Sequence, residues 1–303
     1  MAGGDESFEL YRYHPSMAGA IIFIILFIIT TALHCFQLIR TRTWFMIPMA
    51  VGGFLEWIGY VGRALSSHQA PNYTLGPYIQ QAVLLLVAPA LLAASIYMEL
   101  GRIILLVDGE SRSIIKKRFL TKIFVTGDVL SFLTQSSGGG IMAGQSLSSY
   151  KLGQKVVIIG LVIQIVFFGF FIITSVVFHQ RIKKNPTAAS SSPSIPWLKH
   201  LYALYVGSAF ILIRSIFRVI EYSGGNDGPL LRSEVYLYIF DAVLMFATMV
   251  VFNIIHPAEV KRLLVQRQAG LGATALEADD STEVERIEQH NLEPLKANNG
   301  GWS

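Results

Sequence analysis

The sequence predicts an all-α, polytopic membrane protein with seven transmembrane helices. The chain has 303 residues, of which 52% are hydrophobic and only 15% charged, and its mean hydropathy is +0.51. A soluble domain of this length needs more charge to cover its surface. Seven apolar segments are each long enough to cross a bilayer as a helix. They are too long for barrel strands, and a helix satisfies its own backbone hydrogen bonds.

Sequence signals place each span in turn. The first 16 residues are polar and lack the basic start of a signal peptide, and the apolar run after them is too long for one, so a first helix begins at Met17. The third segment is long enough to tilt, and Pro89 predicts a kink within it. His256 before Pro257 marks the end of the last helix. The predicted spans are Met17–Ile39, Trp44–Ala64, Tyr78–Leu106, Phe119–Met142, Val156–Phe178, Leu198–Tyr222 and Glu234–His256.

The basic residues of the connections predict the orientation. Cytoplasmic loops carry an excess of Lys and Arg. One side has Arg40, Arg42, Arg112, Lys116, Lys117, Arg118, Arg181, Lys183, Lys184, Lys199, Lys261, Arg262 and Arg267, and the other has Arg12, Lys151, Lys155 and Arg232. The N-terminus is therefore expected outside and the C-terminus in the cytoplasm. The sequon "NYT" at Asn72 falls in an outer loop, which predicts glycosylation there.

This topology divides the chain into three parts. Residues 1–16 form an extracellular tail, 17–256 the transmembrane domain, and 257–303 a cytoplasmic tail. From about Ala269 the tail is acidic and poor in aromatic residues, which predicts disorder. The tail could bind cytoplasmic regulators, although a plain solvated segment is the commoner case. The sequence does not define an oligomeric state.

Polar residues recur within the spans at helical spacing. Glu56, Tyr60 and Arg63 follow an i, i+4, i+7 pattern and so share one helix face. Similar stripes on other helices reach the same outer half of the membrane. We expect these side chains to line a substrate cavity: Glu56, Tyr60, Arg63, Gln81, Asp128, Gln135, Gln164, Arg214, Arg218, Glu221, Tyr238 and Asp241.

Charge inside a membrane needs compensation. An ionised side chain at the bilayer centre costs about 2.5–3.5 kcal/mol on insertion scales. Arg214 and Arg218 are expected to pair with carboxylates, most plausibly Glu56 and Asp241. Ion pairs that only join helices are the alternative, but buried pairs seldom improve on apolar packing, which favours a cavity. The excess of carboxylates suits an amphiphile with an amine head group.

Several other classes of protein lack support in the sequence. There is no Walker motif, no HExxH zinc motif and no GxSxG nucleophile elbow. Cys35 is the one cysteine, so no intramolecular disulfide forms. We expect no catalytic residue, no cofactor, no metal and no nucleic-acid partner; the expected partners are membrane lipids or an amphiphilic substrate.

Six stretches together resemble the fungal RTA-like family, known as lipid-translocating exporters. They are "EWIGYVGRALS", "YIQQAVLLLVAPALLAASIYMELGRII", "IFVTGDVLSFLTQSSGGGIMA", "GLVIQIVFFGFF", "LIRSIFRVIEYSGGNDGPLLRSEVYLYIFDAVLM" and "HPAE". The resemblance runs from about Glu56 to Glu259. It implies seven helices with the N-terminus outside, a fungal plasma-membrane location, and a role in handling sphingoid long-chain bases, sterol-like toxic amphiphiles or, in one branch, porphyrins.

The predicted function is therefore a translocator that exports amphiphilic lipids and confers resistance to toxic ones. A lipid or stress receptor without transport, and a porphyrin uptake protein, are the alternatives. An enzyme that uses the carboxylates as acid and base is the weakest alternative, because no spacing is diagnostic of one.

Overall fold

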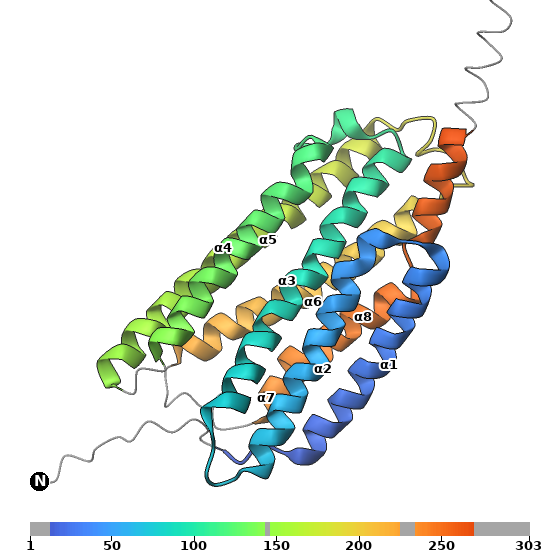
Figure 1. The fold of residues 1–303 in the computed structure, drawn as a ribbon. Helices are drawn as coiled ribbons and strands as arrows, with labels where there is room; N and C mark the ends of the chain where they lie inside the picture. Colours follow the sequence, from blue (N-terminus) through green and yellow to red (C-terminus); the bar gives the residue numbers. More distant parts are fainter. Residues whose placement is uncertain (1–12, 143–145, 225–233, 270–303) are drawn as a thin grey trace, which may run out of the picture. The chain divides into compact units, whose positions relative to one another are not determined.

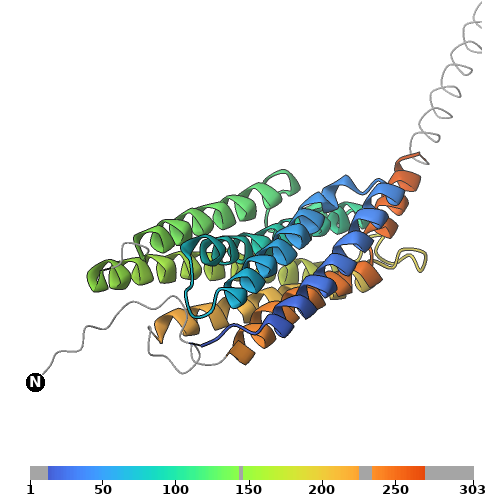
Figure 2. The same ribbon diagram turned by 60° about the horizontal axis from the view of Figure 1, so that its bottom comes forward.

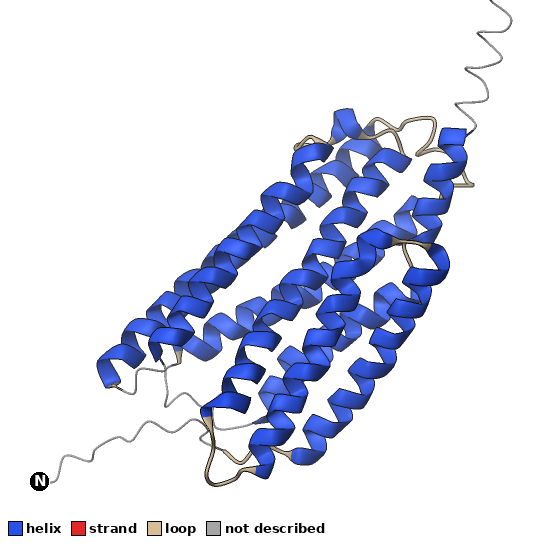
Figure 3. Ribbon diagram, viewed as in Figure 1, coloured by secondary structure: helices blue, strands red, loops and turns tan. Residues whose placement is uncertain are grey.

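The computed structural model describes residues 13–142, 146–224 and 234–269, and within these ranges the chain is helical and contains no strand (Figure 3). Seven long helices make up the bundle. They are α1 (Met17–Thr41), α2 (Ile47–His68), α3 (Leu75–Leu106), α4 (Lys117–Met142), α5 (Leu147–Lys184), α6 (Trp197–Ser223) and a continuous last helix formed by α7 (Glu234–Leu237), η4 (Tyr238–Val243) and α8 (Leu244–Ile254). Two short 3₁₀ turns, η1 (Trp44–Met46) and η2 (Glu110–Arg112), lie in connections.

Local sequence explains where several helices begin and end. The Ser16 side chain caps α1 by accepting a hydrogen bond from the backbone N–H of Gly19. Arg42, in the left-handed conformation with φ 54°, ends that helix. Pro48 lies in the first turn of α2, where its missing N–H costs nothing.

In the unit up to Val260 the helices pack in a ring, and two of them, α3 and α6, also contact each other across its centre. Each helix contacts the next along the chain, and α8 closes the ring by contacting α6 and α1. Contacts between α3 and α6 cross the ring (Figure 1). The α4–α5 pair therefore lies on one side of the crossing, and α1 and α2 lie on the other, as the turned view also shows (Figure 2).

The predicted spans agree closely with the observed helices. Within the described residues, six helical segments are long and apolar enough to cross a membrane: Met17–Thr41, Trp44–His68, Leu75–Leu106, Ser148–Lys184, Trp197–Ser223 and Glu234–Ala269. The fourth predicted span is present as α4, but its composition falls short of that criterion because Gly, Ser and Gln interrupt its apolar residues. The fifth helix begins nine residues before the predicted Val156.

The surface of the bundle is apolar and its interior is partly charged. Exposed side chains on α1 include Ile22 and Ile29, and those on α5 include Val166 and Ile173. Conversely, the Arg63 and Arg214 side chains are among the largest that are fully buried. This inversion suits a helix bundle whose surroundings are lipid rather than water.

A further helical segment follows the last helix of the bundle. After α8 the chain turns at Pro257 and becomes helical again over 258–269, as expected for a helix end at His256. Residues from Lys261 onward belong to a second unit. The predicted disorder of the tail beyond Ala269 and most of the predicted N-terminal tail lie outside the described residues.

Candidate functional site: three buried polar clusters and an apolar cavity

The first group, here called the buried ion cluster, comprises Glu56, Arg214, Arg218, Glu221 and Asp241. Arg214 on α6 donates from Nε to Oδ1 of Asp241 on η4, and the two side chains are 1% and 2% exposed. Arg218 Nη1 donates to Glu221 Oε2 at 2.7 Å, and its Nη2 lies 3.8 Å from Asp241 Oδ2. The predicted pairing of both arginines with Asp241 is therefore present.

Pro89 leaves a backbone hydrogen-bond acceptor free for this cluster, and the acceptor can be located from the sequence. A proline has no N–H, so the carbonyl four residues earlier loses its helical hydrogen bond. In α3 that carbonyl belongs to Leu85, and Arg214 Nη2 donates to it at 2.6 Å. One guanidinium thus satisfies a carboxylate on one helix and an orphaned carbonyl on another.

A π-helical turn positions the carboxylate. Residues Tyr238–Val243 form η4, a π-helix between α7 and α8, and Asp241 lies within it. Such a turn inserts one extra residue and is frequent at functional sites. The extra residue rotates the part of the helix before the turn relative to the part after it. Within this turn, Asp241 is buried against Arg214.

Glu56 departs from the prediction. It is 1% exposed and lies within electrostatic range of Asp241, Arg214 and Arg218. Its Oε1 has no hydrogen-bond partner among the described residues, and neither has the hydroxyl of Tyr60 one turn further along α2. The expected Glu56–arginine ion pair is therefore absent, because Asp241, Glu221 and Leu85 already occupy the guanidinium groups.

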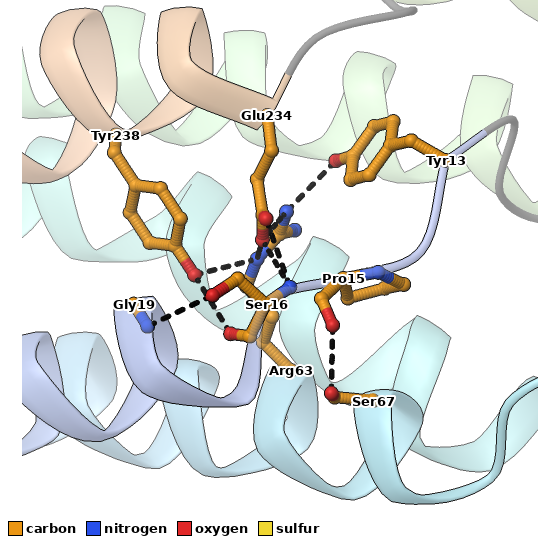
Figure 4. Close-up of polar contacts among 8 residues, drawn as sticks. All are labelled: Tyr13, Pro15, Ser16, Gly19, Arg63, Ser67, Glu234 and Tyr238. Carbon is orange, nitrogen blue, oxygen red and sulfur yellow. Dashed lines mark hydrogen bonds and ion pairs between the residues drawn. The ribbon is translucent and has the colours of Figure 1, made fainter.

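The second group is the Arg63–Glu234 cluster, shown in Figure 4. Arg63 on α2 donates from Nη2 to Glu234 Oε1 on α7 at 2.6 Å, and the Arg63 side chain is 0% exposed. Arg63 also donates to the hydroxyls of Tyr238 and Tyr13, at 3.2 and 2.8 Å. Both Glu234 oxygens accept from the backbone N–H of Ser16, at 2.9 and 2.8 Å. This cluster therefore joins α2, α7 and the segment that precedes α1.

The third group lies between α4 and its neighbours. Gln135 Nε2 donates to Ser131 Oγ at 2.6 Å and to Gln164 Oε1 on α5 at 3.3 Å. Asp128, one turn before Ser131, accepts from the Tyr97 hydroxyl on α3 at 2.9 Å, and its Oδ1 has no hydrogen-bond partner within the described ranges. No cation of the described residues forms an ion pair with Asp128.

Glycines allow α4 and α5 to approach closely enough for these bonds. A Cβ at Gly138 would lie 2.7 Å from the carbonyl oxygen of Gly153. A Cβ at Gly160 would lie 2.9 Å from the carbonyl oxygen of Ser131. Helices α4 and α5 therefore approach each other closely at Gly138 and Gly160, where a side chain would not fit.

A cavity of about 220 Å³ opens between α3, α4, α5 and the end of α6. Its walls are mostly apolar, and Gln135, Ser136, Tyr78 and Tyr222 contribute polar groups. Tyr222 follows Glu221 directly and lies within electrostatic range of Arg218, Arg214 and Asp241. The cavity wall therefore reaches the edge of the buried ion cluster.

That twelve polar residues line one substrate cavity stays a prediction. Of the twelve predicted residues, Gln135 lines this cavity, whereas the others are divided among the clusters described above or packed between helices, as Gln81 is beside Gly62. Arginine–carboxylate pairs satisfy each other instead of facing an open space. Elsewhere in the bundle, Glu99 faces His200, and the Arg102 guanidinium stacks on Phe45, 3.6 Å from the ring centroid.

The sequence reasoning left several of these residues out of the predicted site: Tyr13, Ser16, Leu85, Tyr97, Tyr222 and Glu234. Two of them had a sequence signal: Leu85 lies four residues before Pro89, and Glu234 has i, i+4, i+7 spacing with Tyr238 and Asp241. No three His, Cys, Asp or Glu side chains within the described ranges lie close enough to hold a metal ion.

Apolar helices that bury ion pairs and expose isoleucine define an integral membrane protein, and the comparisons give its family. The chain belongs to the RTA1-like protein family, which matches residues 49–263. The resemblance to the fungal RTA-like family is thus confirmed.

Similar proteins come from Saccharomyces cerevisiae. Protoporphyrin uptake protein 1 is 37% identical over 84% of this chain and 94% of its own length. Protein RTA1 is 38% identical over 83% and 86%, respectively. Sphingoid long-chain base transporter RSB1 is 26% identical over 80% and 72%. No solved structure matches the chain.

Proposed function

We propose that the protein translocates amphiphilic lipids of the sphingoid-base type, with the apolar tail in the cavity and the head group at the buried ion cluster. The observation that carries this proposal is the continuity through Tyr222, which lines the cavity and lies within electrostatic range of Arg218 and Asp241. A largely apolar pocket with a few polar groups at one end matches the two halves of such a molecule.

Charge favours an amine head group. The buried ion cluster contains the carboxylates Glu56, Glu221 and Asp241 but only the guanidinium groups of Arg214 and Arg218. The unpaired member is Glu56, whose Oε1 lacks a partner within the described part of the chain. An ammonium group would supply the missing positive charge and hydrogen-bond donors.

A specific observation supports porphyrin uptake as a second candidate. The relative named for protoporphyrin uptake is among those with the highest identity, and the match covers 94% of its length. The cavity walls are apolar and include Tyr78 and Tyr222, whose rings could pack against a flat macrocycle.

The membrane topology is part of the proposal. Helix α4 has 26 residues and is about 39 Å long, which is enough to span a bilayer. It packs between α3 and α5 with Asp128, Ser131 and Gln135 turned inward, which explains its low hydropathy. With α4 as a seventh span, the excess of Lys and Arg places the N-terminus outside and the C-terminus in the cytoplasm.

The same topology extends to location and modification. Asn72 is exposed in the loop between α2 and α3, on the outer side, where it would be glycosylated. We assign the protein to the fungal plasma membrane, where export would confer resistance to toxic amphiphiles.

Reconstitution tests the proposal. Purified protein in phosphatidylcholine liposomes should move a fluorescent sphingoid base between leaflets faster than protein-free liposomes, and should move its N-acetylated analogue, which lacks the cationic amine, more slowly. Saturable binding without movement would instead indicate a receptor, and movement of a porphyrin alone would establish the second candidate.

A further inference from the structure

A second set of buried titratable groups lies far from the cavity. Glu99 on α3 is thirteen residues beyond Leu86, the last α3 residue of the cavity wall, which corresponds to about 20 Å along the helix. Its side chain is 0% exposed, and neither carboxylate oxygen has a hydrogen-bond partner among the residues that the structure describes. This carboxyl group takes no part in the clusters described above.

His200 connects Glu99 to the end of the bundle. The imidazole, on α6, is 1% exposed. Its Nδ1 lies 3.4 Å from Glu99 Oε1, and its Nε2 lies 3.1 Å from Oε2 of Glu259. The Glu259 side chain is 31% exposed, so it can exchange protons with water. Carboxyl, imidazole and carboxyl thus form a line from the solvent to a fully buried position.

A purely structural role explains this arrangement poorly. A buried carboxylate that only joins helices normally accepts at least one hydrogen bond, as Asp241 does from Arg214 Nε. Glu99 accepts none within the described residues, and its neighbour is the His200 imidazole, a group that can donate from one ring nitrogen and accept at the other. An ionised Glu99 is therefore costly unless His200 is protonated, and a neutral Glu99 needs a proton from elsewhere.

We propose that Glu99, His200 and Glu259 form a proton relay that carries a proton from the solvent at this end of the bundle to the buried Glu99 carboxylate. The O–H bond of protonated Glu259 breaks as an N–H bond forms at His200 Nε2. The N–H bond at Nδ1 then breaks as an O–H bond forms on Glu99. A small rotation of either side chain shortens the 3.4 Å separation to hydrogen-bonding distance. In the topology of the proposed function, this end of the bundle faces the cytosol. That the protons come from the cytosol therefore rests on the proposed function.

Neighbouring charges act on both ends of this proton relay. The charged and titratable side chains that act on it are Lys199 on α6, Arg102 on α3 and His256 after α8. Lys199 Nζ lies 3.3 Å from Glu259 Oε2, and Arg102 lies one turn from Glu99. Lys199 thus holds a positive charge beside the solvent-facing carboxylate of the relay.

Infrared difference spectroscopy between acidic and alkaline buffer tests the proton relay without any transported lipid. The wild-type protein in phosphatidylcholine liposomes should show a carboxylic-acid C=O band that appears on acidification and is lost in Glu99→Gln. The control variant Glu110→Gln removes an exposed carboxylate of η2 and should keep the band. If Glu99→Gln fails to fold, Glu99→Asp should shift the band.

The direction of transfer has its own readout. After a pH jump, Glu259→Gln should slow the appearance of the Glu99 band about tenfold or more, since a positioned acid or base contributes roughly 10²–10⁴-fold to proton transfer. A band unaffected by both Glu99 variants, or an unchanged rate in Glu259→Gln, overturns the proton relay. These outcomes are independent of lipid movement. If the reconstituted protein does not move a sphingoid base, the proposed function is refuted, but the proton relay can still be tested in this way.

Discussion

Removal of Arg214 should destabilise the protein more than removal of its partner Asp241. Arg214→Met leaves Asp241 with only the Arg218 Nη2 contact at 3.8 Å and leaves the Leu85 carbonyl without a donor. Loss of one partner of a buried ion pair costs about 3–5 kcal/mol. Asp241→Leu instead leaves Arg214 bonded to Leu85 and able to turn toward the unpaired Glu56, so we expect a loss of about 1–3 kcal/mol.

The double variant is the decisive comparison. Arg214→Met with Asp241→Leu removes one charge of each sign, so the net charge of the buried ion cluster stays as in the wild type. We expect it to be more stable than Arg214→Met alone, with a coupling free energy of about 1–3 kcal/mol between the two sites.

Unfolding in mixed detergent micelles, followed by circular dichroism, would give the free energies for all four proteins. Exposed Glu110→Gln provides a control with no expected change. Single variants that each cost less than about 1 kcal/mol, with losses that simply add in the double variant, would refute the pairing on which the site is built.

Three further expectations concern the deep carboxylates, the helix contact and the topology. Glu56→Gln and Asp128→Asn should keep the melting temperature but abolish protection of cells against a toxic sphingoid base; loss of both properties together would indicate a purely structural role. Gly138→Val should lower the melting temperature, because its Cβ would lie 2.7 Å from a backbone oxygen of α5, whereas Gly139→Ala, where nothing lies within 4 Å, should not; equal effects would contradict the packing. Asn72 should carry a glycan after expression in a eukaryotic secretory pathway, and a C-terminal tag open to protease in intact cells would contradict the orientation.

Hydropathy alone predicts most of the fold. Apolar length predicts the observed helices, six of which, within the described residues, are apolar enough to cross a membrane. The inward position of polar stripes such as Asp128 and Gln135 follows from the cost of charge in lipid. The observed start of the first helix at Met17 and the end of the third at Leu106 match the prediction. Features that depend on a single helix, namely its length and the position of its polar face, can therefore be predicted from one sequence.

Contacts between helices were harder to predict. Depth in the membrane does not distinguish Glu56 from Asp241 as a partner for Arg214, because the choice depends on the π-helical turn that brings Asp241 into contact. The Glu99–His200 contact joins residues about one hundred positions apart, and no local sequence pattern predicts it. The orphaned Leu85 carbonyl could have been predicted from Pro89, but not the side chain that would fill it.

A bulky side chain inside the cavity provides the most direct test of the proposed function. Gly139 lines the cavity and has no atom within 4 Å of an added Cβ, so Gly139→Leu should fill the space without strain. Gly169 on α5 has equally open surroundings and lies outside the cavity wall, so Gly169→Leu is the matched control. We predict that reconstituted Gly139→Leu retains its melting temperature but loses the movement of fluorescent sphingoid base across liposomes, while Gly169→Leu keeps both. Wild-type rates in a correctly folded Gly139→Leu protein would contradict a translocation path through this cavity.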